Sequence, residues 1–327
     1  MPSTLDEQLD KYLADAHSIE EQALTQLREA PDMASDPGLA DAFRTHLEET
    51  ERHERLVRQR LEARGSEPSR FKKAIMVPGG KAFVLFAKSQ PDTTGKLTAH
   101  SYSYEALEQA SYELLLRVAR RAGDAETERV ASEILADEYE MAHRIEQRFD
   151  AAVEASLREK GATDLREDLG KYLADAHALE MQAEGLLKKG PKVAGDPQLA
   201  LIYEQHLEET RGHQRLVEER LEALGDRPSR IKDAAMRMGA LNWAGFFAAH
   251  PDTPGKLAAF AYAFEHLEIA GYELLSRVAQ RAGDEQTVQV AQRILGEERE
   301  AALKIRGSFD RAVDAALQAQ GVATSSR

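Results

Sequence analysis

Two short segments, 160 residues apart, place histidine and glutamate at spacings that could bind a metal ion. The first reads HLEETERH from His46 to His53, and the second reads HLEETRGH from His206 to His213. In an α-helix, positions i, i+3 and i+7 lie on one face, so the outer histidines and the second glutamate of each segment share a side. Carboxylate and imidazole together suit iron or manganese. The spacing therefore predicts a metal-binding face on a helix.

The two segments belong to a long internal repeat, because a shift of 160 positions aligns the two halves without a gap. KYLADAHSIE at position 11 meets KYLADAHALE at 171, and YELLLRVARRAGD at 112 meets YELLSRVAQRAGD at 272. Residues 1–160 and 161–320 are identical at 80 positions. We therefore predict two domains related by duplication, 1–160 and 161–327. The stretch 77–90, against 237–250, diverges, and its aromatic residues are predicted to cover the bundle or the seam between the copies.

Each repeat is predicted to fold into four long helices. Ala, Leu, Glu, Arg and Gln dominate, and no alternation of β-branched residues indicates strands. In the first repeat, capping residues, prolines and glycines predict helices over roughly 4–29, 36–64, 93–123 and 124–158. A long connection separates the second helix from the third, as in ferritin-like bundles. The predicted fold class is all-α, with two tandem ferritin-like four-helix bundles, each with a long crossover.

On a helical wheel, each predicted helix carries one glutamate in or beside its apolar stripe. In the first repeat these are Glu20, Glu49, Glu108 and Glu138, whereas Glu105 is expected to lie well round towards solvent. A lone buried carboxylate costs several kcal/mol or takes up a proton, and four together also repel one another. Two divalent cations would neutralise four carboxylates. The pattern therefore favours a dinuclear iron or manganese centre in each bundle.

The second repeat supplies the same residue types 160 positions later. The candidate metal ligands of the two repeats are Glu20, His46, Glu49, His53, Glu108, Glu138, Glu180, His206, Glu209, His213, Glu268 and Glu298. We interpret Glu49 and Glu138 as bridges between two ions. Glu20 and Glu108 are then terminal ligands, and His53 supplies nitrogen.

Other histidines are not expected to bind metal. Glu140 and His143 form an E-x-x-H pair, but both lie opposite the apolar face of their helix, and Leu303 replaces the histidine in the second repeat. They are predicted to lie on the surface. His17 and His177 flank the stripes of the first helices and are predicted to be structural or exposed.

The motifs YLADAHALE, HLEET, FEHLEIAGYELL followed by RAGD, and ILGEERE occur in order and cover nearly all of a repeat. With this set, the chain resembles the YciE/YciF-type ferritin-like domain family of bacterial stress-associated proteins. The resemblance implies a ferritin-like core, a dinuclear metal site on the glutamates named above, and dimerisation of single-domain members, but no particular activity. The tandem pair is thus expected to pack as an intramolecular pseudo-dimer, with further homo-oligomerisation left open. Better-understood ferritins have histidine three residues after the glutamate of the second helix, where this chain has Arg52 and Gly212.

Composition excludes several other classes of protein. With 57 acidic and 43 basic residues, the formal charge of −14 argues against a broad basic surface for nucleic acid or anionic membranes. The chain has no cysteine, so disulfides, thiolate catalysis and cysteine-ligated metal centres are excluded. No signal peptide is apparent, and no apolar run approaches the roughly 18 residues of a membrane span. We expect a cytoplasmic protein.

Two functional hypotheses remain. The leading one is a stress-associated protein that binds a dinuclear iron or manganese centre in each bundle, with oxidase or peroxidase-type activity. The alternative is a non-catalytic stress or scaffold protein whose sites are vestigial and free of metal. Metal content after expression separates the two hypotheses.

Overall fold

All regular structure in the described part of the chain is α-helical, as predicted. The residues that the computed structural model describes are 3–66, 93–160, 165–227 and 253–322. The chain divides into two compact units, Met1–Gly161 and Ala162–Arg327. The helices of the first unit are α1 (Leu5–Leu27), α2 (Ala30–Met33), α3 (Pro37–Ala63), α5 (Thr93–Ala122), α6 (Ala125–Glu146) and α7 (Phe149–Lys160). Those of the second are α8 (Leu165–Leu187), α9 (Gly190–Val193), α10 (Pro197–Leu224), α12 (Thr253–Ala282), α13 (Glu285–Gly307) and α14 (Phe309–Ala319).

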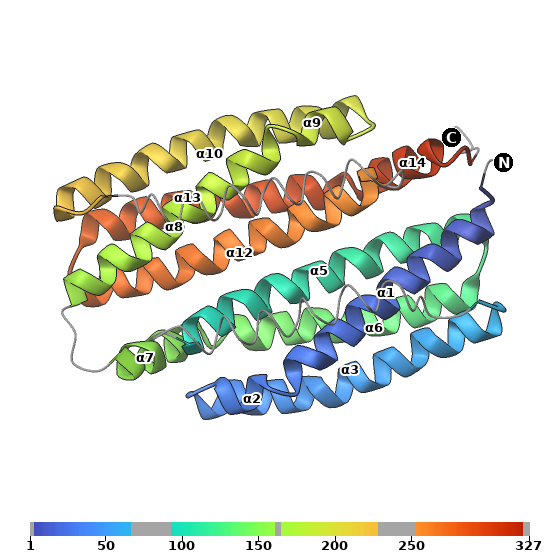
Figure 1. Ribbon diagram of the computed structural model, residues 1–327, viewed down its shortest axis with the longest axis horizontal. Helices are drawn as coiled ribbons and strands as arrows, with labels where there is room; N and C mark the ends of the chain where they lie inside the picture. The colour runs from blue at the N-terminus through green and yellow to red at the C-terminus, as the bar shows by residue number, and fades with distance from the viewer. Residues whose placement is uncertain (1–2, 67–92, 161–164, 228–252, 323–327) are drawn as a thin grey trace. The chain divides into compact units, whose positions relative to one another are not determined.

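Four long helices form the bundle of each unit. In the first unit, α1 and α6 each pack against both α3 and α5, which closes a four-helix bundle (Figure 1). Helices α3 and α5 run in the same direction, as the second and third helices of a ferritin-like bundle do (Figure 1). The second unit repeats the arrangement with α8, α10, α12 and α13. The divergent stretches 77–90 and 237–250 lie outside the described residues, and the packing of the two units as a pseudo-dimer stays a prediction.

The helix predicted over residues 124–158 is in fact two helices. Helix α6 ends at Glu146, and α7 begins at Phe149 and packs against α5. Phe149 is fully buried and meets the Tyr102 ring edge-on, with 5.5 Å between ring centroids. Val153 is buried as well. A two-residue turn at 147–148 interrupts the helix before these buried side chains, which helical periodicity alone does not reveal.

The turn between α5 and α6 fixes where α6 begins. Gly123 has a φ of +70°, which favours glycine, and Asp124 Oδ1 accepts a hydrogen bond from the Thr127 amide at 2.9 Å. Arg60 and Arg64 each reach Asp124 Oδ2 at 2.8 Å. Partial burial raises the pKa of Asp124, but the Thr127 hydrogen bonds and the Arg60 charge outweigh it and lower the pKa to about 2.

Asp124→Ala is expected to lower the free energy of unfolding by about 1–2 kcal/mol, because α6 loses its cap. The folded-state pKa lies below the unfolded value, so this stabilisation is present near neutral pH and is lost as the pH falls through about 2. Urea unfolding at pH 7 measures the loss. Asp41→Ala, at an exposed position of α3, is the control. An equal loss in both variants would contradict the capping role.

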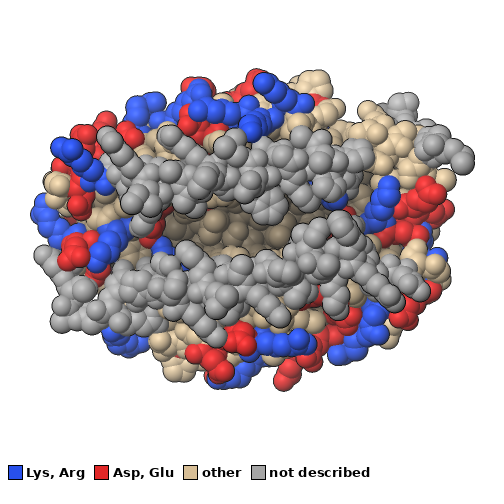
Figure 2. Space-filling model, viewed as in Figure 1, with Lys and Arg blue, Asp and Glu red and all other residues tan. Residues whose placement is uncertain are grey.

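The described helices include no membrane span, and the one face seen in Figure 2 is not broadly basic. No described helix is both long and apolar enough to cross a bilayer. On the face shown in Figure 2, the described Lys and Arg side chains are interspersed with Asp and Glu. The expectation that the chain does not bind nucleic acid stays a prediction.

Candidate metal centre

Six polar side chains from the four bundle helices meet in the interior of the first unit. They are Glu20 of α1, His46 and His53 of α3, Glu105 and Glu108 of α5, and Glu138 of α6. Each is at most 3% exposed. The second unit buries the equivalent six, which are Glu180, His206, His213, Glu265, Glu268 and Glu298. Each repeat therefore builds its own site from equivalent residues, so the site is a property of the repeated fold.

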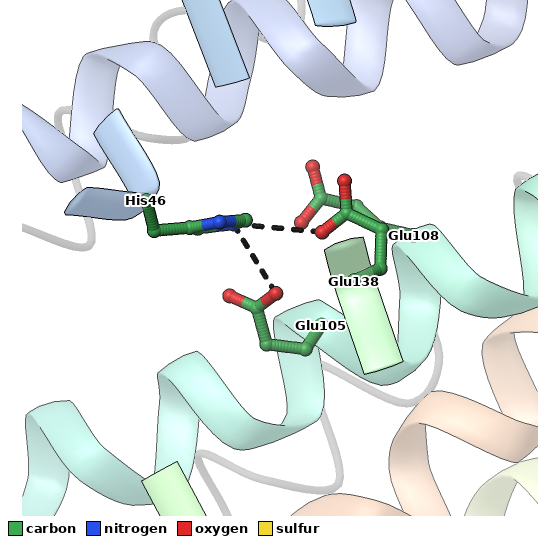
Figure 3. A group of neighbouring side chains, drawn as sticks. All are labelled: His46, Glu105, Glu108 and Glu138. Carbon is green, nitrogen blue, oxygen red and sulfur yellow. Dashed lines mark ion pairs between the residues drawn. The ribbon is translucent and has the colours of Figure 1, made fainter. Parts of the chain in front are cut away.

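The six side chains form two adjoining clusters. Candidate ligand atoms within 4.8 Å of one another define the His46 cluster (Figure 3), which consists of His46, Glu105, Glu108 and Glu138. The same criterion defines the His53 cluster, which consists of Glu20, His53 and Glu138. Glu138 belongs to both, and its two oxygens face different histidines. Oε2 lies 3.5 Å from His46 Nε2, whereas Oε1 lies 2.9 Å from His53 Nδ1. A carboxylate placed in this way is positioned to bridge two ions.

The second unit reproduces this arrangement with its own residues. Its two clusters are made by His206, Glu265, Glu268 and Glu298, and by Glu180, His213 and Glu298. Glu298 is the shared carboxylate. Its Oε2 lies 3.4 Å from His206 Nε2, and its Oε1 lies 2.8 Å from His213 Nδ1.

Most of the polar atoms that converge in each centre have no hydrogen-bond partner. In the first unit these are Glu20 Oε2, His46 Nε2, His53 Nδ1, Glu105 Oε2, and both oxygens of Glu108 and Glu138. The same atoms of the corresponding residues are unpartnered in the second unit. Buried polar atoms are normally hydrogen-bonded. Within the described residues, no Lys or Arg pairs with any of these carboxylates, so the donor set fits a bound cation.

A second layer of side chains orients the candidate ligands. His46 Nδ1 lies 3.1 Å from Glu49 Oε2, and His53 Nε2 lies 3.0 Å from Asp137 Oδ2. Each imidazole therefore has one nitrogen held by a carboxylate and the other directed into its cluster. Metal-binding histidines typically have such a carboxylate partner, which fixes the ring and its tautomer.

The structure leaves Glu49 and Glu209 outside the clusters, although the sequence singled them out as ligands. The Glu49 side chain is 19% exposed and accepts from Arg144 at 3.0 Å. Glu209 is 34% exposed and lies 3.0 Å from His206 Nδ1. The spacing of three residues does bring each histidine and glutamate together. The glutamate, however, meets Nδ1 of the imidazole, which points away from the cluster. The interpretation of Glu49 as a bridge does not match this position.

Glu49→Ala is therefore expected to weaken metal binding by about 10–100-fold without changing the number of ions bound, because only the support of His46 is lost. Competition with a chromophoric chelator measures the affinity. Glu48→Ala, at the exposed neighbouring position, is the matched control. Loss of a whole ion from Glu49→Ala would instead make Glu49 a direct ligand.

Glu105 was predicted to face solvent, and this prediction is wrong. Glu105 and Glu265 are 3% and 2% exposed, and Glu105 Oε2 lies 3.2 Å from His46 Nε2. Helix α5 packs against α1, α6 and α7, so more than one of its faces is buried. A single apolar stripe therefore underestimates the buried arc. The spacing of three residues between Glu105 and Glu108, which recurs in the second repeat, is the signal that could have found it.

Burial and mutual repulsion strongly perturb the ionisation of the first centre. Burial raises the pKa of Glu20 to about 7, against the opposing charge of His53. Burial, then repulsion by Glu138, raises the pKa of Glu108 well above its usual value. Burial disfavours the His53 imidazolium, but the adjacent Glu138 carboxylate, 2.9 Å from Nδ1, and the Glu20 charge outweigh it and raise its pKa to about 9. Without cations, the centre holds protons at neutral pH.

The three other histidines discussed in the sequence analysis lie where the sequence indicated. Glu140 and His143 are 57% and 58% exposed, which confirms that this E-x-x-H pair is on the surface. His17 is buried and lies 3.0 Å from Glu54, so it links α1 to α3 as a structural residue. His177 pairs with Glu218 in the same way.

Fold and site together define a class of protein: tandem four-helix bundles, each enclosing carboxylate–histidine clusters able to hold metal ions. A family model described as "Domain of unknown function (DUF892)" matches residues 4–158 and again 164–318. The chain therefore belongs to the DUF892 family and carries the domain twice in tandem. A comparison with solved structures finds no match.

Proposed function

We propose that each unit binds two divalent cations, iron or manganese, in a dinuclear centre. The shared carboxylate carries this proposal, because one glutamate directs its two oxygens to two histidines of adjoining clusters. One ion would be held by His46, Glu105, Glu108 and Glu138. The other would be held by Glu20, His53 and Glu138. In the second unit, Glu298 takes the bridging position.

Charge balance supports two ions in each centre. Four buried carboxylates that pair with no Lys or Arg among the described residues carry a charge of up to −4, which is costly in a dry interior. Two divalent cations offset that charge, with the imidazoles neutral. Oxygen ligands with one nitrogen for each ion suit manganese and iron better than thiolate-seeking metals.

The residues of the chain prepare the centre in three ways. Glu49 and Asp137 fix the ring orientation of the two histidines. The Tyr112 hydroxyl donates to Glu20 Oε1 at 2.5 Å and so directs the other oxygen of Glu20 to the His53 cluster. The bundle interior also shields the ligands from bulk solvent, since each of the six side chains is at most 3% exposed. A dinuclear iron or manganese centre supplies redox chemistry towards oxygen or peroxide when bound, so we propose a protective role of the YciE/YciF type under oxidative stress.

Metal analysis of the full chain tests the proposal. After expression in medium supplemented with iron or manganese, we expect about two ions in each unit, hence about four in each chain. Electron paramagnetic resonance should show exchange coupling between paired ions, which isolated ions would not give. A protein that retains no stoichiometric metal under either condition would instead fit a scaffold with vestigial sites.

A further inference from the structure

A small cavity lies between α1, α2 and α5, beside the His46 cluster of the first unit. Its volume is about 20 Å³, which is room for one water-sized molecule. The polar residues Gln26, Ser101 and Tyr104 line it, with the Tyr104 hydroxyl donating to the Ile19 carbonyl at 3.0 Å, and Glu105 and Glu108 close it on the side of the cluster. The rest of its lining is apolar. We call Gln26, Ser101 and Tyr104, together with His100, which is hydrogen-bonded to Gln26, the polar path. The cavity joins this path to two candidate metal ligands, Glu105 and Glu108.

Polar atoms along this cavity lack partners. Gln26 is 9% exposed; its Oε1 is hydrogen-bonded to His100 Nε2 at 2.9 Å, but its Nε2 has no partner. Both oxygens of Glu108 are unpartnered as well. A buried donor or acceptor that makes no hydrogen bond lowers the stability of the folded protein. A small molecule that both accepts and donates hydrogen bonds would satisfy the amide and the carboxylate at once.

The second unit keeps the two carboxylates but replaces this polar path with apolar side chains. At the positions of Gln26, His100, Ser101 and Tyr104 it has, respectively, Leu186, Phe260, Ala261 and Phe264. The ring pair itself is retained. Centroids of His100 and Tyr104 lie 5.9 Å apart, and those of Phe260 and Phe264 lie 6.3 Å apart. The rings occupy the same place without nitrogen or hydroxyl groups, so the two units differ in polarity rather than in packing.

We propose that this cavity binds a single water-sized, hydrogen-bonding molecule next to the first centre, and that the second centre has no such site. The two centres of the chain are thus not equivalent. The first exchanges a small polar ligand past Gln26 and Ser101, whereas the corresponding Leu186 and Ala261 of the second offer no polar side chain. The link between the cavity and a bound metal rests on the proposed function.

Manganese is the probe that tests this difference, because water bound to Mn²⁺ speeds the relaxation of bulk water protons. Glu298→Ala in the full chain leaves the first centre, and Glu138→Ala leaves the second. At equal measured loading, we expect a several-fold higher proton relaxivity per ion from the first centre. Equal relaxivities would overturn the proposal. Failure of manganese to load either variant would instead count against the proposed function, so the two failures are distinguishable.

The second repeat supplies a matched set of substitutions. In the Glu298→Ala background, Gln26→Leu, His100→Phe, Ser101→Ala and Tyr104→Phe together should lower the relaxivity to that of the second centre. Gln26→Leu alone, a milder change, should lower it in part. Unchanged relaxivity in both variants at full metal loading would contradict the role of the polar path. In the metal-free protein, a high-resolution crystal structure should show one ordered water in this cavity, and its absence would contradict the site itself.

Discussion

Glu138→Ala is expected to remove both ions of the first centre, although it deletes a single side chain. Glu138 is the only residue common to the His46 and His53 clusters, so its loss takes an oxygen ligand from each ion. The two cations would also repel each other more strongly, because no shared carboxylate would lie between them. The chain should retain about two ions, all in the second unit, and Glu138→Ala with Glu298→Ala should retain none.

Substitutions outside the bridge should give a graded result. Glu20→Ala touches only the His53 cluster, and Glu105→Ala only the His46 cluster, so each is expected to cost one ion. Glu140→Ala is the matched control, because Glu140 lies on the same helix and is 57% exposed. Metal analysis with circular dichroism distinguishes lost ligands from lost folding. If Glu138→Ala cost no more metal than Glu20→Ala, two separate mononuclear sites would fit the centre better.

The four long helices of each repeat were predictable because several of their boundaries have a local cause in the sequence. Asp36 before Pro37 begins α3, and Gly123 with Asp124 divides α5 from α6. These features are short-range and recur in both repeats. The break between α6 and α7 was not predictable, because neither proline nor glycine marks residues 147–148.

The inward-facing residues were predictable only where one apolar stripe defines the buried side. Glu20 and Glu138 lie within the stripes of α1 and α6, and both are fully buried. Helix α5 is buried on several faces, so the stripe misplaced Glu105. Glu49 was misplaced for a different reason. A helical wheel places Glu49 beside His46 but does not show which ring nitrogen it contacts. Contact with Nδ1 makes Glu49 a residue that orients His46 rather than a metal ligand.

The metal-free protein is expected to lose stability as the pH rises from about 6.5 to 9, a trend that bound metal should abolish. The folded-state pKa of His53, about 9, lies above the usual histidine value of 6.5, so the folded state binds protons more tightly than the unfolded state. That stabilisation is complete below pH 6.5 and is lost as the pH rises through 9. His213, with a pKa raised to about 11, acts in the same direction.

Other groups affect stability mainly outside this window. Glu20 and Glu298, both with a pKa of about 7, destabilise the folded state from about pH 4.5 upwards and add to the same trend. Burial lowers the pKa of His100 to about 3 and that of His266 to about 4, and these groups oppose the trend. Their effect is nearly complete by pH 6.5, where their unfolded forms lose the proton. The interval above 6.5 therefore reports the two centres.

Thermal unfolding of the chelator-treated and the manganese-loaded protein between pH 6 and 9 measures this trend. The melting temperature of the metal-free form should fall across the interval. The melting temperature of the manganese-loaded form should stay constant or rise. The cations displace the protons, and the affinity of the centre for metal increases with pH. Glu20→Gln should flatten the metal-free slope near pH 7, since the amide does not titrate. A metal-free protein whose stability rose over this interval would show that the buried carboxylates are compensated by something other than protons, and the case for cations between them would fail with it.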